Sequence, residues 1–113
     1  MSDCLFCKFV AGEITPDVVA ESEHSLAFRD INPKAPVHVL VVPRRHVATA
    51  AELAEASPEE LADVVTLAAS VAEAEGLTGG YRLLTNTGAD AGQTVFHAHV
   101  HLLGGRDLDR PTD

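Results

Sequence analysis

The sequence predicts a single α+β domain built on a five-stranded antiparallel sheet with one long and one short helix. Five short runs have β-like patterns, one long segment has helical periodicity, and tight turns join most of them. One long helix cannot supply the repeated crossovers that a doubly wound parallel sheet requires. Because the chain has 113 residues, we take 1–113 as one domain.

The first part of the chain is predicted to hold the short helix and three strands. The helix spans residues 5–11, where apolar side chains recur with helical spacing, and Gly12 follows as a stop. Strands are predicted over Val18–Glu21, Ser25–Asp30 and Val37–Val42. The last of these is apolar on both faces, so we expect it at the centre of the sheet.

The long helix has clear start and stop signals. Ser57 is a helix cap, Pro58 suits the first helical position, and Glu60 completes a capping box. An apolar stripe follows, and Gly76 is expected to end the helix. A strand is then predicted over Tyr81–Thr85.

Three histidines alternate along the last predicted strand, at about residues 94–103. Alternation on a strand puts His97, His99 and His101 on one face. The first and last would lie roughly 13 Å apart at ~3.3 Å per residue, too far to bind one metal together. We therefore expect the three imidazoles to have different roles; the alternative is a partly exposed polar face of an edge strand.

Composition limits the partners. The formal net charge is −9, which argues against binding to a nucleic-acid backbone. The apolar runs are too short to span a membrane, and no secretory signal is recognisable, so a cytoplasmic location is expected. In that setting Cys4 and Cys7 are more plausible as a metal clip or as reduced thiols than as a disulfide.

The segment His97-Ala98-His99-Val100-His101-Leu102-Leu103 is similar to the histidine-triad signature, in which histidines alternate with hydrophobic residues. Residues 86–96 before it and Gly104-Gly105 after it resemble the Hint-like branch of the histidine-triad (HIT) family, as do residues 26–46. The resemblance covers about residues 4–106 and implies the HIT-like fold. It also implies a homodimer in which two sheets join edge to edge and the long helices pack together.

The resemblance implies a nucleotide-binding hydrolase that cleaves at the α-phosphorus through a nucleotidyl-histidine intermediate. His99 is then the nucleophile, oriented by a backbone carbonyl, since a neutral imidazole is a competent nucleophile near pH 7. His101 would stabilise charge on the phosphate, with His97 completing the triad. Thr94 would donate to the phosphate or to the departing amine. The implied ligands are AMP, GMP or their amides.

The resemblance also implies the residues that bind the nucleotide. Asp30 would accept from both ribose hydroxyls, although an acid in a turn is the simpler interpretation. An apolar slot would surround the base, although each member could equally be core: Phe6, Phe9, Ile14, Phe28, Ile31 and Leu40. The phosphate would meet the segment around Asn86 and the turn that holds Gly92, Gln93 and Val95.

A structural zinc is implied by the Cys-x-x-Cys of bacterial members. Cys4, Cys7, His46 and His97 would form a closed Cys2His2 site. The alternative is two buried thiols that pack as small apolar groups.

The leading functional hypothesis is a nucleoside phosphoramidase. The alternatives are a Fhit-like dinucleoside polyphosphate hydrolase, a non-catalytic nucleotide-binding module, and a metal hydrolase with two histidine ligands. The tail from Arg106 lacks the Trp common in Hint-like proteins. Arg106 and Arg110 could attract an acidic leaving group, or they could simply be solvated.

Overall fold

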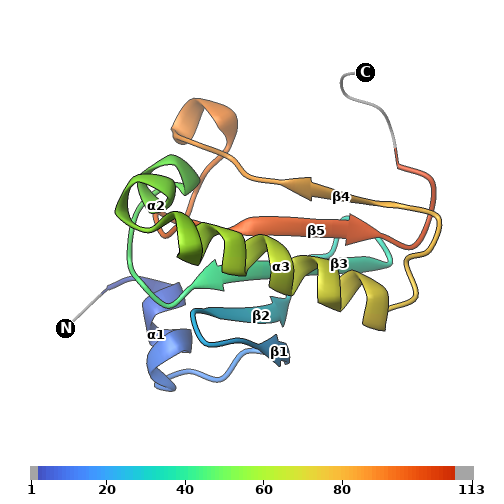
Figure 1. Ribbon diagram of the computed structural model, residues 1–113, viewed down its shortest axis with the longest axis horizontal. Coiled ribbons are helices and arrows are strands. Elements are labelled where there is room, and N and C mark those ends of the chain that lie inside the picture. Colours follow the sequence, from blue (N-terminus) through green and yellow to red (C-terminus); the bar gives the residue numbers. More distant parts are fainter. Residues whose placement is uncertain (1–2, 109–113) are drawn as a thin grey trace.

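The structure is a computed structural model that describes residues 3–108. Five strands form one antiparallel sheet in the order β1-β2-β3-β5-β4 (Figure 1), which confirms the predicted fold class. The central position of β3 is also as predicted. The strands are β1 (Val18–Glu21), β2 (Ser25–Arg29), β3 (Val37–Pro43), β4 (Tyr81–Leu84) and β5 (Val100–Gly104).

The predicted helices are present, and the structure adds one more. Helix α1 (Leu5–Ala11) ends at Gly12, whose φ of 79° is easily adopted only by glycine. Helix α3 (Pro58–Ala74) starts at the predicted cap, where the Glu60 amide donates to the Ser57 hydroxyl at 3.2 Å. The additional helix α2 (Ala50–Ala56) directly precedes it. A short 3-10 turn, η1 (Ala89–Ala91), lies between β4 and β5.

The two faces of the sheet have separate cores, because side chains alternate along each strand. On β3, Val39 and Val41 face α3, which lies across one face of the sheet (Figure 1). Leu40 and Val42 face the other way and pack with Phe6 of α1. This two-sided burial explains why β3 is apolar apart from His38.

The predicted triad strand is wrong over its first half. The strand pairing begins at Val100, whereas residues 94–99 run outside the ladder. The reason is that this segment bonds instead to the chain that follows β3: the Ala98 amide donates to the Val47 carbonyl at 2.7 Å. Of the three triad histidines, only His101 lies on a strand.

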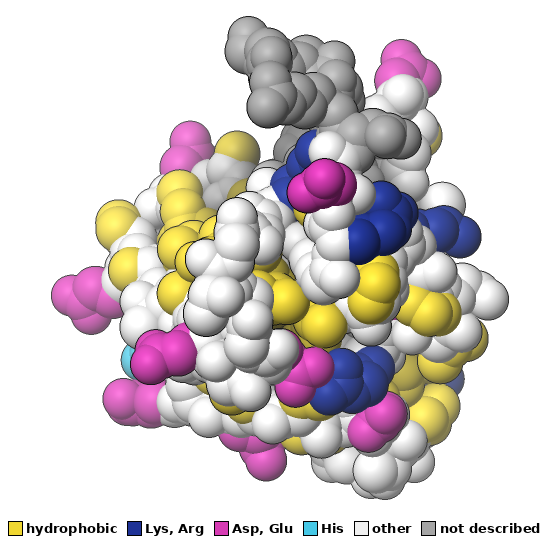
Figure 2. Space-filling view, turned by 90° about the vertical axis from the view of Figure 1, so that its right-hand side faces the viewer, with side chains coloured by type: hydrophobic (Ala, Val, Ile, Leu, Met, Phe, Trp, Pro, Cys, Tyr) yellow, Lys and Arg dark blue, Asp and Glu magenta, His cyan; other side chains and the backbone are white. Residues whose placement is uncertain are grey.

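The surface has no large charged region on the face shown in Figure 2, where acidic and basic side chains are interspersed. Within residues 3–108, no helix is long and apolar enough to cross a membrane.

Candidate active site and metal cluster

His99 is held in one orientation by the backbone of its neighbour. Its Nδ1 lies 2.8 Å from the His97 carbonyl oxygen, and the side chain is only 9% exposed. A carbonyl can only accept, so Nδ1 carries the proton and Nε2 keeps its lone pair. Phe6 meets the ring edge-on, with centroids 5.1 Å apart. A backbone carbonyl is therefore the orienting group, as the sequence analysis expects.

One further hydrogen bond supports this segment. The Thr85 hydroxyl donates to the His99 carbonyl at 2.8 Å, directly after the end of β4. Thr85 therefore takes over where the ladder between β4 and β5 ends. In the sequence, Thr85 ends a predicted strand and has no predicted role in the site.

His101 is fixed by a histidine to which the sequence analysis assigned no role. The Lys34 amide donates to His38 Nδ1 at 3.0 Å, so a neutral His38 carries its proton on Nε2. That nitrogen lies 2.9 Å from His101 Nδ1 and donates to it. His101 consequently has its own proton on Nε2, where it can serve a ligand. The one available signal was a single histidine, His38, within an otherwise apolar central strand.

Both members of this pair are neutral near pH 7 in the ligand-free protein. Burial lowers the pKa of His101 to about 4, with His99 and His38 adding to the effect and Asp30 opposing it. Burial also lowers the pKa of His38, again against the attraction of Asp30. The stabilisation available from His101 is therefore that of a hydrogen-bond donor.

Asp30 lies beside this pair at the end of β2. One carboxylate oxygen accepts from the Asn32 amide at 2.8 Å, which is the turn role that the simpler interpretation gave it. The other oxygen lies 3.5 Å from His38 Nε2. The structure thus places Asp30 both in a turn and against the histidine pair.

A cavity of about 370 Å³ adjoins Asp30. All six side chains predicted for the base slot line this cavity. Phe6 and Phe28 are buried, whereas Ile31 is 92% exposed. Its size is within the usual range for small-molecule sites. The full lining is Leu5, Phe6, Phe9, Ile14, Thr15, Pro16, Asp17, Phe28, Arg29, Asp30, Ile31 and Leu40, and five of these were not predicted.

The Gln93 side chain shapes the loop before the triad and is only 4% exposed. Its amide nitrogen donates to the carbonyls of Ala48 and Val95 at 2.7 and 3.0 Å, and its oxygen accepts from the Gly88 amide at 2.8 Å. Both amide hydrogens are thus engaged with the protein. The Gln93 side chain therefore holds the loop, and its amide hydrogens are not directed at a phosphate bound to the turn.

The remaining loop residues lie around this strut. Gly92 has a φ of 97° at the end of η1, a conformation that other residues rarely adopt. Asn86 is half-buried just beyond β4. Thr94 and Val95 line an open depression of about 480 Å³ together with Cys4 and His46, outside the cavity that Asp30 lines.

Cys4, Cys7, His46 and His97 come together as predicted for a metal centre. His97 Nδ1 lies 3.5 Å from each sulfur and 3.2 Å from His46 Nδ1, and His46 Nδ1 lies 3.1 Å from the Cys7 sulfur. A tetrahedral zinc with bonds of ~2.3 Å to sulfur and ~2.0–2.1 Å to nitrogen sets its ligand atoms about 3.3–3.6 Å apart in N–N and S–N pairs. The cluster therefore fits zinc.

The protonation of His97 also suits a metal ligand. Its Nε2 donates to the Pro43 carbonyl at 2.8 Å, which leaves the Nδ1 lone pair directed at the sulfurs. Burial lowers the pKa of His97, so the ring stays neutral, as metal binding requires.

Asp30, His38 and His101 form a second group with metal-ligand atoms close together. This group does not suit a metal. Because the Lys34 amide occupies His38 Nδ1, binding a cation through Nε2 would require a His38 ring with no proton at all. His38 and His101 are instead joined by a hydrogen bond, with the Lys34 amide donating to His38; we call these bonds the histidine relay.

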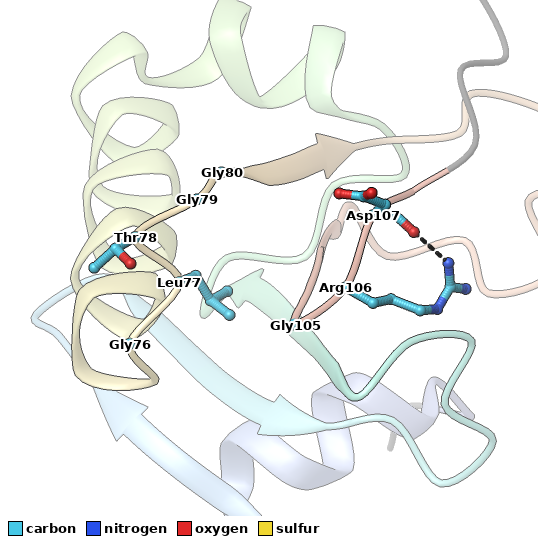
Figure 3. A pocket seen from close by; sticks show the side chains of 8 residues that line it. All are labelled: Gly76, Leu77, Thr78, Gly79, Gly80, Gly105, Arg106 and Asp107. Carbon is cyan, nitrogen blue, oxygen red and sulfur yellow. Dashed lines mark hydrogen bonds between the residues drawn. The ribbon is translucent and has the colours of Figure 1, made fainter.

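A cavity of about 310 Å³ lies at the carboxyl end of α3, away from the histidines (Figure 3). Glycines 76, 79, 80 and 105 contribute backbone to it, and Arg106 and Asp107 lie on one side. Arg106 donates to the carbonyls of Asp107 and Lys34 at 2.7 and 3.0 Å. Arg106 therefore braces the loop whose amide caps His38. Arg110 lies outside the described residues.

The family model of the HIT domain matches residues 11–108. This chain belongs to the HIT domain family. A purine nucleoside phosphoramidase from Escherichia coli K12 is 41% identical over 107 residues, which cover 94% of this chain and 90% of that protein. The crystal structure of a HIT family hydrolase from Legionella pneumophila Philadelphia 1 superposes with a TM-score of 0.91, at 47% identity, over 96% of this chain and 98% of that one.

A histidine triad nucleotide-binding protein from Candida albicans is more distant. It has a TM-score of 0.80 and 31% identity, over 98% of this chain and 87% of that one. Together these HIT proteins confirm the family resemblance and the fold expected from the sequence, and they identify the chain as an enzyme of the HIT type, a HIT family hydrolase.

Proposed function

We propose that this HIT protein hydrolyses the P–N bond of purine nucleoside 5′-phosphoramidates, such as amides of AMP or GMP, through a nucleotide attached to His99. The hydrogen bond from His99 Nδ1 to the His97 carbonyl carries the proposal, because it leaves Nε2 as an oriented nucleophile. The name of the E. coli relative, purine nucleoside phosphoramidase, supports the choice of bond and base.

The substrate is oriented by groups on both sides of His99. The base enters the apolar cavity, and the ribose hydroxyls donate to Asp30 at its edge. The phosphate lies between His99 and His101, where the His101 Nε2–H stabilises charge on its oxygens. Backbone amides of the loop held by Gln93, together with Thr94 and Asn86, complete the phosphate site.

The reaction has two steps. His99 Nε2 attacks the α-phosphorus, the P–N bond breaks, and the departing amine takes a proton. Water then attacks the same phosphorus, the bond to His99 breaks, and the nucleoside monophosphate leaves. Throughout, the proton stays on His99 Nδ1 and is donated to the His97 carbonyl, so the nucleophile is regenerated in the same orientation.

Hydrolysis of an adenosine monophosphate alkylamide by the wild type and by His99→Ala tests this function. We expect turnover only by the wild type, with both proteins folded and both binding AMP. Activity in both would show that His99 is not the nucleophile. AMP binding without turnover of any substrate would favour a binding module, and a preference for dinucleoside polyphosphates over amides would favour the Fhit-like alternative.

We further propose that Cys4, Cys7, His46 and His97 bind one structural zinc. The ion would cross-link the amino-terminal segment to the residue whose carbonyl orients His99. Protein purified without chelator should contain one zinc per chain, and Cys7→Ser should lose it and unfold at a lower temperature. Wild-type protein that is fully folded without zinc, and whose melting temperature does not rise when zinc is added, would contradict the proposal.

The third part of the proposal is a cytoplasmic homodimer. Strand β4 is at the edge of the sheet, and its Leu84 and Tyr81 are 40% and 42% exposed. Val65 of α3 is 43% exposed as well. Pairing of two β4 strands would cover these side chains and remove an open edge. Zinc binding by Cys4 and Cys7 requires reduced thiols, which are typical of a reducing compartment.

A further inference from the structure

Protonation of the leaving amine raises a problem of proton supply. In the resting pair, His38 and His101 hold two protons, on His38 Nε2 and on His101 Nε2. If the pair gave one away, His101 could be restored only by taking the His38 proton, which would leave His38 as an imidazolate. Such an anion is far too basic to form near neutral pH. The pair must therefore gain a proton before it can act as an acid.

The position of this additional proton is limited by the Lys34 amide, which points its hydrogen at His38 Nδ1. The additional proton must go to His101 Nδ1. Two N–H groups would then oppose each other across the 2.9 Å that now separate His38 Nε2 from His101 Nδ1. The protonated pair consequently needs an acceptor other than its own rings.

Asp30 is placed to be that acceptor. One of its carboxylate oxygens lies 3.5 Å from His38 Nε2. A carboxylate oxygen of Asp30 and one ring nitrogen of each histidine also lie within 4.8 Å of one another. The His38 side chain is 4% exposed and that of Asp30 is 20% exposed, so water screens their attraction only in part. Asp30 favours the charged state of both histidines, whereas Lys34 opposes it at His38 and His99 opposes it at His101.

We propose that Asp30 is a positioning residue for acid–base chemistry, the counterion that allows the His38–His101 pair to carry the proton delivered to the leaving amine. This inference rests on the proposed phosphoramidase activity. It gives Asp30 a second role beside its contact with the ribose. Substrate binding would favour the added proton, since the anionic phosphate lies next to His101.

The protons balance over the cycle. In the first step His101 Nε2 gives its proton to the amine nitrogen as the P–N bond breaks and the bond from His99 to phosphorus forms. His101 is then neutral, with its remaining proton on Nδ1 facing Asp30. In the second step the attacking water gives a proton to His101 Nε2, which restores the charged pair. Asp30 accepts from both rings throughout.

The test separates ribose binding from acid catalysis by combining Asp30→Asn with four substrates. Two are alkylamides of adenosine and of 2′,3′-dideoxyadenosine monophosphate, and two are the matching p-nitrophenyl esters. Asparagine keeps an oxygen that can accept from the Asn32 amide, so the turn is preserved. We expect kcat for both amides to fall on the order of 10- to 100-fold, a part of what a positioned acid supplies.

The esters show whether the effect of Asp30→Asn depends on protonation of the leaving group, because a purely structural defect would slow amides and esters equally. A p-nitrophenolate leaves without a proton, so Asp30→Asn should change the rate of the first turnover of the esters, in which p-nitrophenolate departs, by less than about threefold. Asp17→Asn is the matched control: Asp17 lines the same cavity and pairs with Arg29 at 3.9 Å, and its loss should leave the ratio of amide to ester rates unchanged. Asp30→Ser, which also keeps an oxygen for the turn, should repeat the Asn result.

The outcomes are distinct. An unchanged kcat for the dideoxy amide, with a raised KM for the ribose substrates only, would reduce Asp30 to a ribose ligand and overturn the inference. An equal loss of the first-turnover rate with amides and esters would also overturn it, because a defect in that step would not depend on the proton given to the amine. If the wild type fails to hydrolyse the amides at all, the proposed function itself is wrong.

Discussion

Replacing Gln93 with alanine tests whether its side chain stabilises the loop before the triad or binds the phosphate. The substitution removes three hydrogen bonds of a side chain that is 4% exposed, to Gly88, Ala48 and Val95. Each such bond contributes ~1 kcal/mol net, so we expect a loss of about 3 kcal/mol in the free energy of unfolding. For a domain of this size that corresponds to a melting temperature lower by roughly 10–20 °C.

The assay is urea unfolding at one fixed protein concentration, paired with AMP binding by calorimetry. Gln93→Glu serves as a control, because the carboxylate still accepts from Gly88 but cannot donate to the carbonyls of Ala48 and Val95. Repulsion from those carbonyls raises the carboxyl pKa in the folded state, so this variant should gain stability as the pH falls. If Gln93→Ala lowers the free energy of unfolding by less than about 1 kcal/mol and greatly weakens AMP binding, Gln93 is a phosphate ligand and does not stabilise the loop.

Three further outcomes are expected. His38→Phe keeps the ring but removes the donor to His101 Nδ1. It should lower kcat for amides by about 10- to 100-fold with an unchanged circular dichroism spectrum, and full activity would contradict the relay. Burial lowers the pKa of His101 from its usual 6.5 to about 4. Between these two pH values His101 is therefore protonated in the unfolded chain but neutral in the native chain. The free energy of unfolding should therefore fall as the pH is lowered from about 6.5 towards 4 in urea titrations, and a flat profile would contradict the buried neutral pair. Leu84→Glu on edge strand β4 should give a monomer in size-exclusion chromatography with light scattering, whereas Val18→Glu, equally exposed at 40% on edge strand β1, should not; a dimer in both would exclude pairing through β4.

Local signals in the sequence were sufficient for most of the fold. Ser57 and Pro58 marked the start of α3 correctly because capping depends on neighbouring residues only. Helix α2 had a similar signal that was overlooked: Thr49 accepts from the Glu52 amide at 3.2 Å, and Glu52 in turn accepts from the Ala48 amide at 2.9 Å.

Long-range contacts set the limits of the prediction. The alternation of histidines with apolar residues indicated a strand from Thr94 onward. Instead, the Ala98 amide donates to Val47 after β3 and the His97 ring to Pro43 at the end of β3, and residues 94–99 lie outside the ladder. The pairing of His38 with His101 joins residues 63 positions apart, and only the register of β3 with β5 brings them together. Gln93 was assigned to phosphate because its chemistry allowed it, whereas burial decided its partners.

The contacts of His97 link the cysteine cluster to His99. Its Nε2 donates to Pro43, its Nδ1 faces Cys4, Cys7 and His46, and its carbonyl accepts from His99. A shift of the His97 ring therefore moves the carbonyl that orients His99. The segment can leave the sheet and still hold His99 rigidly, because side-chain bonds replace the ladder on one side and Thr85 replaces it on the other. The proposed metal site and His99, the proposed nucleophile, are thus coupled through a single residue. A disturbance of the sulfurs should change the proposed activity through His97, without any contact between the sulfurs and the substrate.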